Sequence, residues 1–135
     1  MKILIVDDET AIAQVFQQAL TQAGYEVILA ATGKEGQDKA LSEKPDIILL
    51  DQILPDMNGN QVLQTLKSQG ATKSIPVAIV SNFNQDGLVD NAMKAGAIEY
   101  ILKYQISPQD LVEKVKQMIA SQNGTGWQDS NDVVI

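Results

Sequence analysis

Five polar side chains that could together move a phosphoryl group stand at the ends of short apolar runs: Asp7, Asp8, Asp51, Ser81 and Lys103. If these runs are parallel strands, their carboxyl ends meet at one edge of a sheet, where ligands bind in open α/β folds. Two carboxylates about 4 Å apart repel by roughly 4 kcal/mol at an effective dielectric of 20, so the acids need a cation. Mg²⁺ is the ion that suits a site made of carboxylate oxygens and lacking His and Cys ligands. We therefore predict that Asp51 is an exposed nucleophile. The metal ion, the ammonium of Lys103 and the hydroxyl of Ser81 would surround it.

The apolar runs alternate with amphipathic segments along the whole chain. Residues 2–6, 25–30, 47–50, 76–81 and 97–102 are predicted strands, and the helices are predicted at 11–23, from 32 to before 45, from 58 to 70, at 85–95 and from 107 onward. Gly24 and Gly96 are predicted to end helices, and Asn58 to cap one. In the helix at 85–95, Leu88 and Met93 are among the residues predicted to face inward. This alternation predicts right-handed βαβ units and a doubly wound parallel sheet.

Composition excludes several classes of protein. The 135 residues suit one domain, and the net charge of −7 argues against electrostatic binding of nucleic acid. The chain has no Arg, no His and no Cys, so it carries no guanidinium clamp, no histidine phosphodonor and no disulfide. We expect neither signal peptide nor membrane span, and therefore a cytoplasmic protein. Residues 1–121 are predicted to form the domain, and the polar residues 122–135 a mobile tail.

Four motifs in order, ILIVDDE, ILLDQILPDMNG, VAIVSN and EYILK, resemble the receiver domain of two-component response regulators, and in particular the single-domain chemotaxis regulator. The resemblance covers about residues 1–121. It implies a flavodoxin-like (βα)5 three-layer sandwich with strand order 2-1-3-4-5. It also implies that the protein catalyses its own phosphorylation and dephosphorylation without being a conventional enzyme.

The resemblance assigns roles to the residues at the strand ends. Asp51 would be the phosphoacceptor, and Mg²⁺ would be held by Asp7, Asp8, Asp51 and the backbone carbonyl of Ile53. Glu9 is expected to be an electrostatic neighbour of the metal rather than a ligand. The phosphodonor would be a histidine on a partner kinase or phosphotransfer protein.

The resemblance also implies a switch. Lys103 would pair with the phosphoryl group, Ser81 would hydrogen-bond one of its oxygens, and Tyr100 would turn inward when Ser81 moves. The output surface would comprise the fourth helix, fifth strand and fifth helix, with a phosphorylation-dependent homodimer as one possibility.

Three positions depart from the family pattern. Tyr104 replaces the proline that usually follows the strand-five lysine, so we expect the loop to take a different path. Asn82 replaces a very small residue and would narrow access for the donor histidine. Ile53 and Phe83 are bulky and apolar, which predicts slow self-dephosphorylation because they would keep water away from the acyl phosphate.

Several alternatives stay open. Asp7 and Asp8 could simply cap the first helix. A flavin carrier would need a phosphate-binding first loop in place of three acids, and an aspartyl phosphatase would need an acid where Ile53 stands. The chain could also be a pseudo-receiver that only binds proteins, or the receiver half of a truncated DNA-binding regulator. We expect a stand-alone protein, because no output domain follows residue 121.

Overall fold

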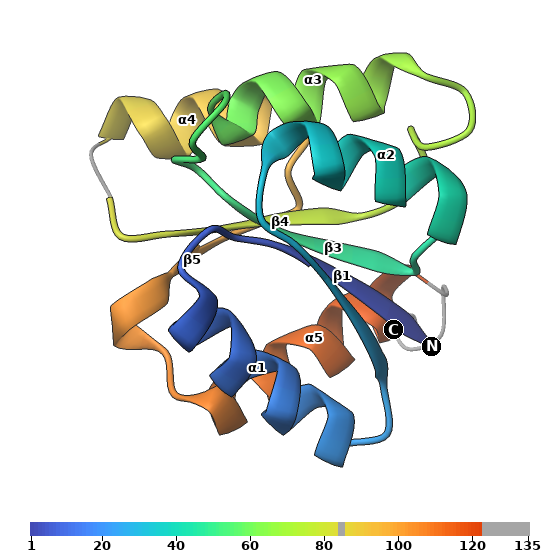
Figure 1. Ribbon diagram of the computed structural model, residues 1–135. Coiled ribbons are helices and arrows are strands. Elements are labelled where there is room, and N and C mark those ends of the chain that lie inside the picture. The colour runs from blue at the N-terminus through green and yellow to red at the C-terminus, as the bar shows by residue number, and fades with distance from the viewer. Residues whose placement is uncertain (84–85, 123–135) are drawn as a thin grey trace, which may run out of the picture.

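The computed structural model describes residues 1–83 and 86–122, in which a five-stranded parallel sheet alternates with five helices (Figure 1). The strands are β1 (Lys2–Val6), β2 (Glu26–Ala30), β3 (Ile47–Asp51), β4 (Val77–Ser81) and β5 (Glu99–Leu102). The helices are α1 (Thr10–Gln22), α2 (Gly33–Glu43), α3 (Gly59–Ser68), α4 (Asp86–Lys94) and α5 (Pro108–Gln122), and a single 3-10 turn spans Lys103–Gln105. The strand order β2-β1-β3-β4-β5 confirms the predicted fold.

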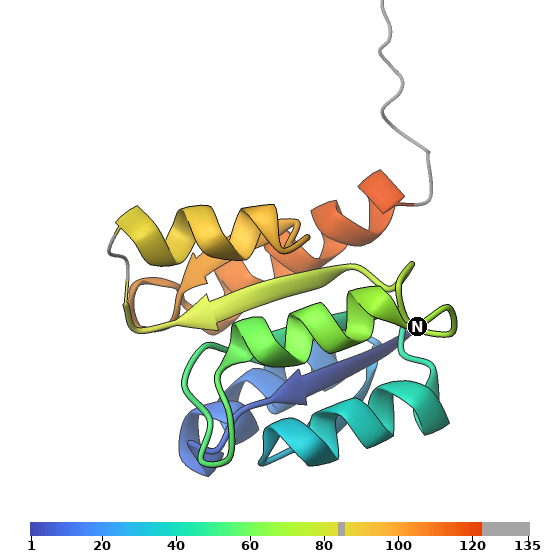
Figure 2. The ribbon, with the colours of Figure 1, turned by 90° about the horizontal axis from the view of Figure 1, so that it is seen from above.

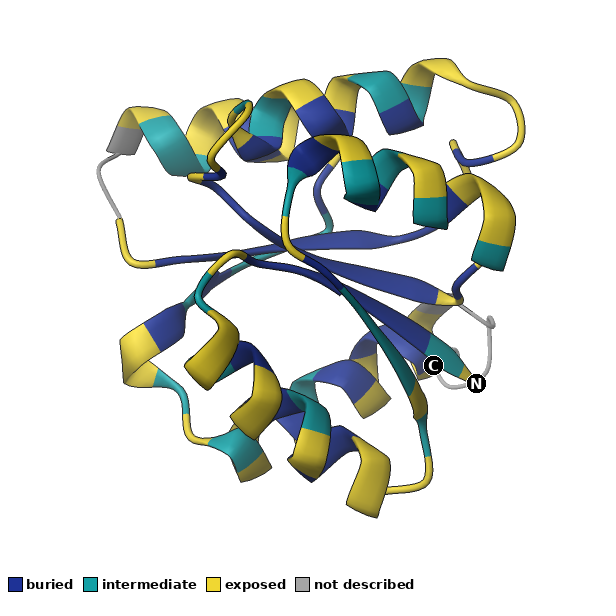
Figure 3. Cartoon of the chain, viewed as in Figure 1, coloured by how far each residue is buried: buried dark blue, intermediate teal, exposed yellow. Residues whose placement is uncertain are grey.

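Helices cover both faces of the sheet, α1 and α5 on one and α2, α3 and α4 on the other (Figure 1). Side chains alternate along each strand, so neighbouring residues belong to different cores. Leu49 packs in the core under α1 and α5, whereas Leu50 packs in the core under α2 to α4. The strands β3 and β4 are buried along their full length (Figure 3), as the predicted two-sided burial of residues 47–50 requires.

Local signals place the helix ends. The side chain of Asn58 accepts the Gln61 N–H at 2.9 Å while the Gln61 side chain accepts the Asn58 N–H at 3.0 Å, a complete capping box at the start of α3. Gly24 and Gly96 have φ of 101° and 110°, the left-handed conformation that ends α1 and α4. The α3 helix starts directly beyond the strand that carries Asp51, so its cap fixes one side of the candidate site.

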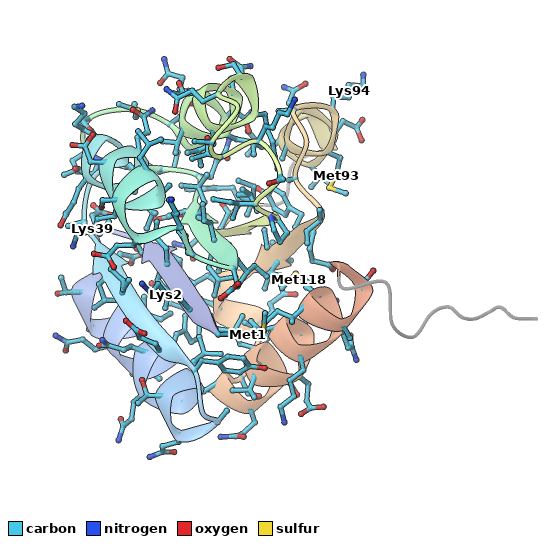
Figure 4. All side chains as sticks on the ribbon, turned by 90° about the vertical axis from the view of Figure 1, so that its right-hand side faces the viewer. Met1, Lys2, Lys39, Met93, Lys94 and Met118 are labelled. Carbon is cyan, nitrogen blue, oxygen red and sulfur yellow. The ribbon has the colours of Figure 1, made fainter. Side chains whose placement is uncertain are left out.

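One expectation needs correction, and two others fall at least partly outside the described residues. Met93 lies on the outer side of α4 with 44% of its surface exposed (Figure 4), so the prediction that it faces inward is wrong. Ala92, which was also predicted to face inward, is fully buried. The predicted start of this helix at residue 85 and residues 123–135 of the predicted tail lie outside the described residues, whereas Gln122, where the tail was predicted to begin, is the last residue of α5. In the part of the chain that the structure describes, no helix has the length and apolar character of a membrane span.

Candidate functional site

Three acids from two neighbouring strands converge at the carboxyl edge of the sheet, the edge to which the β1 and β4 arrowheads point in Figure 2. The strands β1 and β3 pair in parallel, with Val6 opposite Leu50, so the residues that follow them are neighbours. Carboxylate oxygens of Asp7, Asp8 and Asp51 all lie within 4.8 Å of one another. This grouping is the one that the sequence predicted.

Burial differs among the acids. Asp8 is exposed, but Asp7 and Asp51 each keep only 6% of their surface accessible, so the prediction of an exposed Asp51 is wrong. The Asp51 carboxylate lies 3.1 Å from the buried ammonium of Lys103 and close to Asp7. The helix-capping alternative finds little support, because the N-cap of α1 is Glu9, whose own side chain makes no capping hydrogen bond. One Asp7 oxygen instead accepts the Glu9 N–H at 2.9 Å.

Lys103 reaches the same point from β5. Its ammonium lies 2.9 Å from an Asp7 oxygen, 2.6 Å from a Glu9 oxygen and 3.1 Å from an Asp51 oxygen, and its side chain is fully buried. Three carboxylates therefore occupy the three N–H donors of one ammonium. A buried lysine is stable here only because these anions offset its loss of hydration.

The electrostatics of the pocket make ionisation of Asp51 less favourable than that of a free carboxyl group. Burial and the charge of Asp7 raise the pKa of Asp51 to about 6, although contacts with Lys103 and the Ile53 N–H pull it down. Burial also lowers the pKa of Lys103, but hydrogen bonds to Glu9 and Asp7 and the charge of Asp51 outweigh it, so the net shift is upward. Lys103 therefore stays charged, and the carboxylates are incompletely neutralised.

Glu9 and Tyr104 join the site in a way that the sequence did not predict. The Tyr104 hydroxyl donates to one Glu9 oxygen at 2.8 Å while the other Glu9 oxygen accepts from Lys103. Hydrogen bonds from Lys103 and Tyr104 lower the pKa of Glu9, with a smaller contribution from Asn82. Among the described residues no peptide bond is cis, so the chain passes from Lys103 to Tyr104 through a trans peptide into the 3-10 turn.

The loop between β3 and α3 is a tight turn fixed at both ends. Ile53 and Asn58 form an isolated antiparallel bridge, and the Gly59 N–H donates to the Gln52 carbonyl at 2.7 Å. A Cβ at Gly59 would lie 2.6 Å from the backbone oxygen of Asp51, so only glycine permits this approach. Among the described residues, no hydrogen bond ends on the Ile53 carbonyl oxygen, which leaves that atom available to a metal.

The same loop is attached to α2. The Asp56 carboxylate accepts the Gly33 N–H at 2.7 Å and the Lys34 N–H at 3.0 Å, which caps the first turn of α2 from a distant part of the chain. These backbone hydrogen bonds lower the pKa of Asp56. The local cap of α2 is Thr32, whose hydroxyl accepts the Glu35 N–H at 3.0 Å.

Ser81 and Tyr100 lie on the neighbouring strands β4 and β5. Ser81 is fully buried, and its oxygen accepts the Phe83 N–H at 3.1 Å. The Tyr100 hydroxyl donates to the Phe83 carbonyl at 2.5 Å, which links β5 to the loop after β4. The backbone of Phe83 therefore connects Ser81 to Tyr100 through two hydrogen bonds.

Three exposed apolar side chains surround the buried charges. Ile53, Phe83 and Tyr104 keep 56%, 45% and 65% of their surface accessible, and each comes from the loop after a different strand. Apolar exposure of this kind beside a polar pocket favours contact with another macromolecule.

Comparison with known proteins gives one family. Residues 3–116 match the response regulator receiver domain. The chain is 36% identical over 118 residues to the alkaline phosphatase synthesis transcriptional regulatory protein PhoP of Bacillus subtilis, a match that covers 87% of this chain but only 48% of PhoP. The chain therefore spans about half the length of this relative.

Solved structures agree with this match. A CheY-like response regulator receiver domain protein from Methanospirillum hungatei superposes with a TM-score of 0.84 at 36% identity, covering 90% of this chain and 95% of that one. The Mn²⁺-bound form of the response regulator Rcp1 superposes with a TM-score of 0.71 at 25% identity, covering 88% and 91%.

Proposed function

This chain belongs to the response regulator receiver domain family of two-component systems, and on that premise we propose that it accepts a phosphoryl group on Asp51 from a phosphohistidine of a partner kinase or phosphotransfer protein. The observation that carries the proposal is the convergence of Asp7, Asp8 and Asp51 within 4.8 Å, with Lys103 at 3.1 Å from Asp51. These four side chains supply the nucleophile, the metal ligands and the positive charge that the proposed reaction uses.

In the proposed reaction an Asp51 oxygen attacks phosphorus, a P–O bond forms and the P–N bond of the phosphohistidine breaks. The electron pair of that bond leaves with the imidazole nitrogen, and Asp51 becomes an acyl phosphate. Lys103 stabilises the negative charge on the phosphoryl oxygens, because its ammonium is already positioned beside the accepting oxygen.

The residues present fit a divalent cation. Asp7, Asp8 and Asp51 offer hard oxygen ligands, and the Ile53 carbonyl oxygen would complete the set. Burial first, and then the charge of Asp7, raise the pKa of Asp51, and a bound cation would oppose both effects. We propose Mg²⁺ as the resident ion; when bound it would neutralise charge on the phosphoryl group.

The proposed switch runs through Ser81, Phe83 and Tyr100. A phosphoryl group adds about two negative charges and three acceptor oxygens, which would draw the Ser81 hydroxyl away from the Phe83 N–H. The Tyr100 hydroxyl is bonded to the carbonyl of the same residue, so the change would reach the α4-β5-α5 surface and its partners, or a second copy of this chain.

We further propose a cytoplasmic protein in which residues 1–121 act as the receiver and residues 122–135 as a tail. The chain covers 48% of PhoP, which supports the alternative that these residues act as the receiver part of a larger regulator with an output domain.

The decisive experiment incubates the protein with Mg²⁺ and either a small phosphodonor or beryllofluoride, and records intact mass and binding. We expect one phosphoryl group per chain in the wild type and none in Asp51→Asn. Asp38→Asn is the matched control, because Asp38 is an exposed acid on α2 that pairs only with Lys34 at 3.0 Å. Equal phosphorylation of wild type and Asp51→Asn would show that Asp51 is not the acceptor.

A further inference from the structure

The ammonium of Lys103 is fully engaged before any phosphoryl group arrives. It has three N–H donors, and these face Asp7, Glu9 and Asp51. A phosphoryl group on Asp51 would replace the contact between Lys103 and the Asp51 carboxylate. A metal ion on Asp7 would likewise compete with the contact between Lys103 and Asp7. The strength of the one remaining contact of Lys103 then determines how strongly its ammonium can bind the phosphoryl group.

That remaining contact is with Glu9, which differs from the two other partners. Glu9 is outside the group of three acids that could hold a metal, and its contact with Lys103 is the shortest of the three, at 2.6 Å. Its second oxygen accepts the Tyr104 hydroxyl at 2.8 Å. The Glu9 carboxylate is thus fixed at both oxygens, in an orientation that faces Lys103.

We infer that Glu9, fixed by the Tyr104 hydroxyl, is a positioning residue that shares the Lys103 ammonium with the phosphorylation pocket. This inference rests on the proposed function and names how that site is regulated. Glu9 draws positive charge away from Asp7 and Asp51, which leaves these acids more open to Mg²⁺. For the same reason it moderates the contact of Lys103 with the phosphoryl group.

Glu9→Gln tests the inference because it keeps the shape and removes the charge. Lys103 would then bind Asp7 and Asp51 more tightly and compete with the metal, so we expect the Kd for Mg²⁺ to rise by about two- to fivefold, the range of a partly exposed ion pair. At saturating Mg²⁺ the freed ammonium would bind beryllofluoride better, so the Kd for beryllofluoride should fall by about twofold. Calorimetry measures the first constant and fluorine NMR the second.

Tyr104→Phe removes only the hydroxyl and should shift both constants in the same directions, each by less than Glu9→Gln does. Two matched controls lie far from the site. Glu26→Gln removes a carboxylate of β2 that is 4.0 Å from Lys2, and Tyr25→Phe removes a hydroxyl just before β2. Both controls should leave the two constants unchanged.

The route through Lys103 is tested by repeating Glu9→Gln in a Lys103→Met background, where most of the effect on Mg²⁺ should disappear. If Lys103→Met does not fold by circular dichroism, the Tyr104→Phe result decides alone.

A rise in the Kd for Mg²⁺ together with a fall in the Kd for beryllofluoride supports the inference, because a general loosening of the site would weaken the binding of both. It is overturned if both constants rise, if neither moves, if the controls move equally, or if the full effect persists without Lys103. A wild-type protein that binds neither Mg²⁺ nor beryllofluoride would instead refute the proposed function itself.

Discussion

Asp51→Asn should make the metal-free protein more stable, although it removes the proposed phosphoacceptor. The pKa of Asp51 rises from 3.8 to about 6 on folding, because burial and Asp7 outweigh the attraction of Lys103. Each pKa unit corresponds to about 1.4 kcal/mol, so the ionised carboxylate costs up to about 3 kcal/mol at neutral pH. Since water and ions screen part of this cost, we expect a gain of about 1–3 kcal/mol for the neutral amide.

The pH dependence has a definite sign. Because the folded-state pKa lies above the unfolded value, folding takes up a proton between about pH 4 and 6, and the penalty from Asp51 is relieved as the pH falls through 6. The advantage of Asp51→Asn should therefore be full at pH 7.5 and small at pH 4.5. Mg²⁺ should narrow it at pH 7.5, because the wild type binds the ion better than the variant.

The assay is thermal unfolding with and without EDTA, followed by circular dichroism. A gain of 1–3 kcal/mol corresponds to a rise in Tm of about 4–10 °C for a domain of this size. Asp38→Asn, with the same chemical change on the exposed face of α2, should leave the Tm within about 1 °C. A variant Asp51→Asn that melts at or below the wild type in EDTA at pH 7.5 would refute the electrostatic reasoning.

Two further predictions concern the loop after β3, and a third concerns the exposed side chains of Ile53 and Phe83. Gly59→Ala places a Cβ 2.6 Å from the Asp51 backbone oxygen, so it should destabilise the protein by about 1–3 kcal/mol in urea unfolding and weaken Mg²⁺ binding; an unchanged midpoint would contradict the close approach. Asp56→Ala removes the distant cap of α2 and should cost about 0.5–1.5 kcal/mol, with faster amide exchange in the first turn of α2 as the local signature; protection equal to wild type there would argue against the cap. Ile53 and Phe83 stand exposed beside the site and should slow hydrolysis of the acyl phosphate, so a phosphorylated lifetime of only seconds, measured by loss of mass, would count against shielding.

The sequence alone predicted the fold and the members of the acid group, because both depend on short-range patterns. Four apolar residues before Asp51 suffice to indicate a buried strand, and parallel strands bring their carboxyl ends together whatever the side chains. The boundaries differ by one or two residues. For example, β5 begins at Glu99 rather than Ala97, because the Ala97 N–H is bonded to Ala92 at the end of α4.

The sequence failed where a side chain bonds to a group that lies far along the chain. The Tyr104 hydroxyl meets Glu9 across 95 positions, and Asp56 caps α2 across 23. Contacts between residues so far apart in the sequence produce no periodic pattern of residue types. The sequence offered only one indication of the Glu9–Tyr104 contact, that Glu9 directly follows the acidic pair and Tyr104 directly follows Lys103. Burial of Asp51 was also missed, because its carboxylate packs against Lys103, which lies 52 positions further along the chain.

The charges of the pocket suggest an order of events. At neutral pH the carboxylates of Asp7, Asp8, Glu9 and Asp51 face the single ammonium of Lys103, which leaves three negative charges uncompensated when all four acids are ionised. A phosphoryl group would bring about two more while removing the charge of Asp51 itself. Bound Mg²⁺ offsets two charges at this point, and Lys103 cannot offset more than one. Efficient phosphorylation should therefore require the metal first, and the share of Lys103 that Glu9 retains should set how much metal is needed.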